Sequence, residues 1–125
     1  MNRTVLTLRI CGWSSIGMGL IFFLIPGWYA ELEGATTENI AWLRNLGAAL
    51  VAVNGVGALL AAEDPERERR LYDVVMLASV LETIALGWST LMWEFSATEA
   101  VFITGPLALA ALVSVALVAF RPAKG

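Results

Sequence analysis

A segment of mixed acidic and basic residues, positions 63–70, divides this 125-residue chain near its midpoint. Seven of its eight positions carry a charged side chain, so the segment cannot lie in the hydrocarbon core of a membrane. On both sides the sequence is apolar and rich in glycine and alanine over long distances. The charged segment therefore predicts a water-exposed turn between two apolar hairpins.

The apolar regions divide into stretches of the length that a membrane helix needs. Hydrophobic residues make up 58% of the chain and charged residues only 15%, against about 25% charged in an average soluble domain. A helix of about 20 apolar residues crosses the hydrocarbon core of a bilayer. We therefore predict an all-α protein, a single integral membrane domain over residues 1–125. Its four transmembrane helices, paired as two hairpins, are expected at about residues 4–25, 40–62, 65–94 and 97–120.

Proline and capping patterns mark where these helices begin and end. Pro26-Gly27 is expected to end the first helix, because proline cannot continue the hydrogen-bond ladder. Asp64-Pro65-Glu66 has the N-cap, first-turn proline and acidic residue typical of a helix start. Ser96 and Glu99 form a capping box ahead of the last helix. Pro106 falls well inside that helix, where we expect a kink.

The basic residues are distributed unevenly along this pattern. Seven of the eight lie at the chain ends or in the charged segment: Arg3, Arg9, Arg67, Arg69, Arg70, Arg121 and Lys124. Cytoplasmic loops of membrane proteins are enriched in Lys and Arg, whereas the other two loops here contain acidic residues and have only Arg44 nearby. The pattern predicts a multi-pass protein of the inner (plasma) membrane with both termini in the cytoplasm.

Three polar residues fall inside the apolar stretches, where burial is costly: Arg9, Asn54 and Glu82. A carboxylate at the centre of a membrane helix costs about 2.5–3.5 kcal/mol on insertion scales, so Glu82 should face the bundle and either pair or stay protonated. Counted from the charged segment, Asn54 and Glu82 both lie about 13 Å inside the membrane edge. Arg9 enters about 9 Å deep, and its long side chain is expected to reach Glu82 as an ion pair.

A competing helix register would place Arg44 and Asn45, instead of Asn54, level with Glu82. We disfavour this register because it would draw Arg70 into hydrocarbon. The polar cluster then has two main interpretations. It is either a hydrogen-bonded structural staple that fixes how the helices align, or a carboxylate that handles protons or cations and lines a cavity. Contact with a partner subunit is a third interpretation.

The five tryptophans separate into two groups by their predicted depth. Trp28, Trp42 and Trp93 fall near the predicted outer interface, where the amphipathic indole ring anchors membrane proteins. Trp13 and Trp88 lie deeper, and we expect them to pack in the core. The alternative for Trp13 and Trp88 is an aromatic-lined pocket.

Small residues recur at helical spacing on the predicted second helix: Gly47, Asn54, Gly57, Ala58 and Ala61. Small side chains allow membrane helices to approach closely. We expect this stripe to pack within the bundle, and the alternative is a seam between two copies of the chain.

The chain lacks the residues that several kinds of chemistry require. It contains no histidine and a single cysteine, Cys11, so the usual zinc and iron ligand sets cannot form and no metal or other cofactor is expected. Cys11 is expected to be a small apolar filler. No basic surface indicates nucleic-acid binding. No nucleophile and base pair is recognisable, so we expect no enzyme activity.

The glycine pattern of the first two predicted helices has a parallel in a known family. Gly17-Met-Gly19-Leu, the Pro26 that follows, Arg44-Asn-Leu-Gly47-Ala and Gly55-Val-Gly57 resemble the small bacterial four-helix membrane proteins of the DoxX-like kind. The resemblance covers only the first two helices. It implies a four-helix bundle and no particular activity.

The short loops leave no room for a further domain, which leads us to expect a non-catalytic accessory or assembly subunit of a membrane complex. Its expected partners are membrane lipids and either another protein subunit or a second copy of the chain. The alternative is a small proton-coupled transporter or channel. In that case Glu82 carries the proton, and Asn54 and Arg9 adjust its chemistry.

Overall fold

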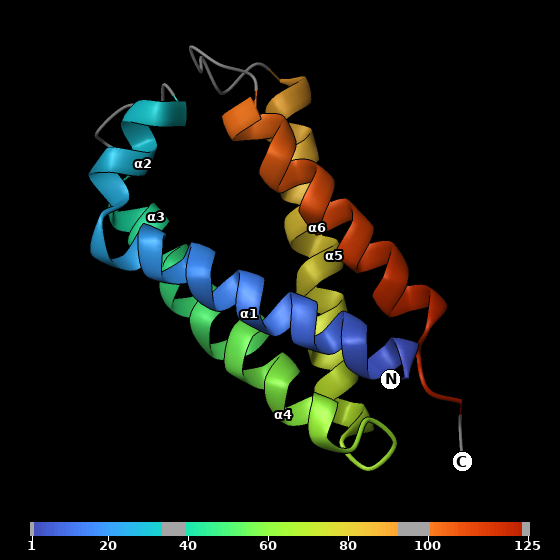
Figure 1. Ribbon diagram of the computed structural model, residues 1–125. Coiled ribbons are helices and arrows are strands. Elements are labelled where there is room, and N and C mark those ends of the chain that lie inside the picture. The colour runs from blue at the N-terminus through green and yellow to red at the C-terminus, as the bar shows by residue number, and fades with distance from the viewer. Residues whose placement is uncertain (1, 34–39, 93–100, 124–125) are drawn as a thin grey trace.

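The computed structural model describes residues 2–33, 40–92 and 101–123 of the chain, and these residues form helices joined by turns without any strand (Figure 1). The helices follow one another as α1, α2, α3, the π-helix η2, α4, α5 and α6. The predicted all-α class is therefore confirmed for the described residues.

The first apolar stretch forms α1, Arg3–Leu24, and its start is capped by Asn2, whose side chain accepts a hydrogen bond from the Thr4 backbone N–H at 2.9 Å. The helix ends just before Pro26, as predicted. We expected a loop to follow, but Pro26 instead begins a short helix, α2, Pro26–Glu33. Proline is favourable at the first position of a helix, because the N–H that it lacks would have no partner there.

The second apolar stretch forms one rod of three consecutive helical segments, Ile40–Glu63. The rod begins as α3, Ile40–Ala49, continues as the π-helix η2, Leu50–Gly57, and ends as α4, Ala58–Glu63. Its bounds agree with the predicted helix, but the π-helical section was not expected. Such sections are rare and occur frequently at functional sites.

After the charged turn the chain continues as α5, Arg69–Leu91, and then as α6, Val101–Ala119, which contains Pro106. The prediction that α5 begins at Pro65 is wrong by four residues. Residues 65–68 form a turn instead, which is held by hydrogen bonds from the Arg67 N–H to Asp64 Oδ1 at 3.2 Å and from the Glu68 N–H to the Asp64 carbonyl at 2.9 Å. The predicted capping box at Ser96 lies outside the described residues.

Three helical segments in the described chain are long and apolar enough to cross a membrane: Arg3–Leu24, Ile40–Glu63 and Arg69–Leu91. The apolar segment of α6, Thr104–Ala119, is shorter. The structure is therefore that of a helical, membrane-spanning type of protein. A fourth crossing and the cytoplasmic position of both termini stay predictions.

The main hydrophobic core lies at the end of the molecule that carries both termini and the charged turn (Figure 1). Tyr72 is fully buried there and donates a hydrogen bond from its hydroxyl to the Leu117 carbonyl at 2.6 Å. Thr4 Oγ1 donates to the Phe120 carbonyl at 2.8 Å. Both bonds satisfy carbonyls near the C-terminal end of α6, where intrahelical donors run out.

Away from this end the helices form two arms, a first arm of α1 with the rod that begins at α3 and a second arm of α5 with α6 (Figure 1). Among the described residues α5 contacts α4 and η2 but not α3, so the arms separate beyond η2. Helix α2 lies at the end where the two arms are apart, and it contacts α6 there.

Candidate binding cavity

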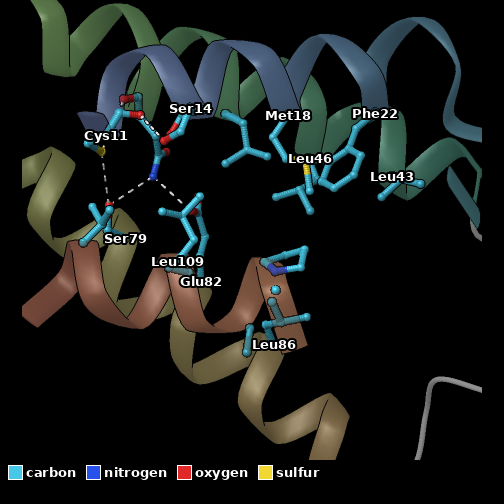
Figure 2. A pocket seen from close by; sticks show the side chains of 18 of the residues that line it. Cys11, Ser14, Met18, Phe22, Leu43, Leu46, Ser79, Glu82, Leu86 and Leu109 are labelled. Carbon is cyan, nitrogen blue, oxygen red and sulfur yellow. Dashed lines mark hydrogen bonds between the residues drawn. The ribbon is translucent and has the colours of Figure 1, made fainter. Parts of the chain in front are cut away.

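A cavity of about 460 Å³ lies between the two arms. Side chains from α1, α2, α3, η2, α5 and α6 line it. In Figure 2 the polar side chains Cys11, Ser79 and Glu82 gather at one end of the cavity, whereas Phe22 and Leu43 lie toward the other. The cavity therefore has a polar end, close to the core, and an apolar end that extends toward α2.

The polar end is organised around Asn54, which is 2% exposed. Its amide nitrogen, Nδ2, donates to Glu82 Oε2 at 2.9 Å and to Ser79 Oγ at 3.3 Å. Ser79 Oγ also lies 3.9 Å from Cys11 Sγ, and this thiol donates to the backbone carbonyl of Asn54 at 3.6 Å. The cluster formed by Cys11, Asn54, Ser79 and Glu82, called the polar cluster below, thus joins α1, η2 and α5.

The helical geometry explains why these side chains meet. Ser79 and Glu82 are three residues apart and project from the same face of α5. Asn54 lies in η2, which, like α4, contacts both α1 and α5. Close approach of the first arm's two helices is possible because glycines face each other: a Cβ at Gly47 would lie 2.6 Å from the Gly19 carbonyl oxygen.

One atom of the polar cluster has no hydrogen-bond partner. Asn54 Oδ1 is buried and unpaired, although both hydrogens of the same amide are used. A buried carbonyl oxygen without a partner costs about 1–3 kcal/mol, and such groups are few in native proteins. The polar cluster therefore contains a buried hydrogen-bond acceptor that no group in the described part of the chain satisfies.

Glu82 has no basic partner among the described residues, whose one ion pair joins Arg121 to Asp73 at 2.7 Å near the C-terminal end of α6. The carboxyl group is half-buried, and its recorded hydrogen bond comes from Asn54. A carboxyl group inside a membrane bundle either holds a proton or binds a cation. Glu82 can either hold a proton or bind a cation, because no basic side chain among the described residues pairs with it.

The rest of the cavity wall is mainly apolar, although Ser14, Ser15 and Ser89 also line it. Met18 and Phe22 come from α1, Leu46 from α3 and Leu109 from α6. Tyr29 of α2 closes this end, with its ring 4.7 Å from that of Phe22 in an edge-to-face arrangement. Pockets of this kind, apolar with a few converging polar groups, are typical of small-molecule sites.

Of the three polar residues singled out in the sequence, the structure brings together Asn54 and Glu82 but not Arg9. Arg9 is exposed, and the expected ion pair with Glu82 is absent. The reason is angular: positions 9 and 11 are about 200° apart around a helix, so Arg9 points outward where Cys11 points into the bundle. Residue counting predicted how far along the helix Arg9 lies, but not the direction in which its side chain points around the helix axis.

The competing register is also absent. Arg44 and Asn45 are both exposed, and Arg44 Nε donates to the Phe23 carbonyl at 3.4 Å instead of approaching Glu82.

The tryptophans mostly face outward. Trp28 and Trp42 are exposed, as interfacial anchors would be, and Trp93 lies outside the described residues. Trp13 and Trp88 are each 65% exposed, so both core packing and a pocket lined by these rings are wrong. In a membrane protein a large apolar ring needs no burial in protein, because lipid surrounds it.

The sequence analysis did not assign Cys11, Ser79 or Tyr29 to a site. The helical spacing of Ser79 to Glu82 was a usable signal, because both residues fall on one face of α5. The cavity itself had no sequence signal, since it results from how far the two arms separate. No cluster of His, Cys, Asp or Glu that could hold a metal ion occurs in the described part of the chain.

Comparisons with known proteins add no functional information. The chain matches no protein-family model, no curated protein and no solved structure. The resemblance to DoxX-like proteins therefore stays a prediction, and the argument for function rests on the cavity.

Proposed function

We propose that this protein is a small membrane carrier that binds a largely apolar solute in the cavity and couples its movement to protonation of Glu82. The observation that carries the proposal is the position of Glu82: a carboxyl group without a basic partner among the described residues lines the cavity, and its hydrogen-bond donor is the buried Asn54. Ionisable residues inside membrane segments commonly mark substrate and proton paths. The cavity volume, about 460 Å³, is within the usual range of ligand pockets, about 300–1,000 Å³.

The arrangement of the arms supports a carrier rather than an enzyme. The polar cluster contains acceptors and weak donors but no base positioned beside a nucleophile. The two arms meet at the core and separate toward α2, which is a geometry that a hinge motion between rigid helix pairs can open or close.

Proteoliposomes test the proposal. The purified chain is reconstituted with a pH-sensitive dye inside the vesicles, and gradients of small apolar solutes bearing an amine, hydroxyl or carboxyl group are applied. We expect proton movement driven by at least one solute, above the rate in empty vesicles, and loss of that excess in Glu82→Gln. Glu66→Gln, the same change in the exposed charged turn, should behave as wild type.

Circular dichroism and gel filtration establish that Glu82→Gln remains folded. A folded Glu82→Gln protein with wild-type proton movement would contradict the proposal, and so would the absence of proton movement above empty vesicles for every solute.

The accessory-subunit hypothesis stays the alternative, and its test is independent of the cavity. Mild detergent extraction from native membranes should then recover the chain with one protein at fixed stoichiometry, whereas a carrier is expected as a species made of this chain alone.

A further inference from the structure

We infer that the solute bound in the cavity carries a protonated amine, which Glu82 of the polar cluster holds, with its apolar body along the wall toward Phe22 (Figure 2). This inference rests on the proposed function and names the class of solute.

The first argument is the balance of donors and acceptors at the polar end. The Asn54 amide offers no further donor to a ligand, because its two hydrogens are used by Glu82 and Ser79. The Cys11 thiol donates its hydrogen to the backbone carbonyl of Asn54. At this end the cavity is lined by the Glu82 carboxyl group and the hydroxyls of Ser14, Ser15 and Ser79, whereas Asn54 Oδ1 is buried from solvent. The ligand group that complements the Glu82 carboxylate is a donor.

The second argument is charge. Within the described chain no basic side chain pairs with Glu82, and the ionised form of a carboxyl group inside a membrane bundle is favourable only with a cationic partner. A primary ammonium supplies that charge and has three hydrogens to donate at the Glu82 carboxylate. A hydroxyl supplies the donor without the charge, and a carboxylate would place like charges together.

The third argument is the shape of the remainder. Beyond the polar cluster the cavity wall is mainly apolar, with Met18, Phe22 and Leu109 among its residues, and its other polar groups are uncharged hydroxyls such as those of Ser15 and Ser89. No charged residue other than Glu82 lines the cavity among the described residues. The part of the ligand that follows the amine is therefore apolar, which favours an alkyl or aryl amine over a polar one such as an amino sugar or an amino acid.

Three probes of equal chain length test the inference: n-octylamine, n-octanol and octanoate, which differ only in the head group. Binding of each labelled probe is measured at neutral pH to the chain in uncharged phosphatidylcholine nanodiscs, with binding to empty nanodiscs subtracted. We expect octylamine to bind at least about tenfold more tightly than octanol, a difference of about 1.4 kcal/mol, and octanoate to bind least. Equal affinities for the three probes would overturn the inference without any variant being needed.

Variants locate the bound amine. Glu82→Gln should weaken octylamine binding about tenfold and leave octanol binding within about twofold, because only the charged head loses its partner. Glu66→Gln is the matched control and should change neither. Unchanged octylamine affinity in a folded Glu82→Gln protein would also overturn the inference.

Binding and flux separate the two proposals. Proton movement driven by a solute without an amine, together with no preference for octylamine, would overturn the amine inference and leave the carrier. Saturable octylamine binding that depends on Glu82, without proton movement for any solute, would support the site and overturn the carrier.

Discussion

Asn54 shows how one residue can be well packed and still incomplete. Its amide nitrogen makes two hydrogen bonds, while its oxygen is buried and makes none. A leucine of similar size would avoid the cost of an unpaired carbonyl, about 1–3 kcal/mol. The polarity of Asn54 is instead explained by the two hydrogen bonds of its nitrogen, which join η2 to α5.

Tyr72 is the opposite case, a buried polar side chain that is satisfied within the chain. Its hydroxyl donates to the Leu117 carbonyl at 2.6 Å, with no exposure to solvent. In Tyr72→Phe that carbonyl loses its donor, and we expect the free energy of unfolding to fall by about 1–3 kcal/mol. Denaturant unfolding in detergent micelles measures the change.

Trp88→Phe is the control for this prediction, because Trp88 is exposed and its change should stay within about 0.5 kcal/mol. An unfolding free energy for Tyr72→Phe equal to that of Trp88→Phe would show that the hydroxyl contributes nothing to the core.

At the scale of elements, the contact between α1 and α3 depends on glycine. A Cβ at Gly47 would approach the Gly19 carbonyl oxygen to 2.6 Å and the Phe23 backbone nitrogen to 2.7 Å. These are backbone atoms, which cannot rotate away as a flexible side chain can. The stripe of small residues predicted on the second helix therefore packs, at Gly47, against α1 of the same chain.

Gly47→Ala should therefore push α1 away from α3 and lower the free energy of unfolding by about 1–3 kcal/mol, the usual effect of overpacking. Gly17→Ala is the matched control: Gly17 lies in α1 with no atom within 4 Å of an added Cβ. Alanine there should be neutral or stabilising by about 0.5–1 kcal/mol, because it favours the helix more than glycine does. Equal effects of the two substitutions on unfolding would contradict the close contact.

The elements themselves were largely predictable, because their ends coincide with strong local signals. The charged turn, Pro26 and the lengths of the apolar stretches predict the bounds of α1 and of the rod Ile40–Glu63 to within one or two residues. The helix α2 was not predicted, because Pro26 was interpreted only as the end of α1, although a proline that ends one helix can also begin the next. The π-helix η2 was not predicted, because the glycine and apolar pattern of residues 50–57 is equally compatible with an α-helix.

At the scale of the whole molecule, the depth of a residue along its helix could be counted from the sequence, but the direction of its side chain around the helix could not. Counting residues from the charged turn predicted that Asn54 and Glu82 share a level, and they form a hydrogen bond at 2.9 Å. The same counting placed Arg9 beside them, but Arg9 lies on the outer side of α1. In lipid a large apolar side chain can face outward at no cost, so Trp13 and Trp88, which are both exposed, did not indicate which face of their helices points into the bundle.

The arrangement of the two arms determines what the protein can hold. Core packing and the hydrogen bond from Thr4 Oγ1 to the Phe120 carbonyl join the arms at the end with the charged turn. Beyond η2 the arms separate, and the polar cluster lies where the separation begins. A bound molecule therefore contacts both arms at once, and its binding energy can change how far they open.

The most direct test of this account is the side-chain amide signal of Asn54 in an NMR spectrum of the chain in lipid nanodiscs. Octylamine is titrated in, and octanoate serves as the comparison ligand. We predict that the Asn54 side-chain signals shift saturably with octylamine and hardly with octanoate, while those of exposed Asn45 stay in place with both. Asn54 signals that do not move, or that move no more than those of Asn45, would contradict the account.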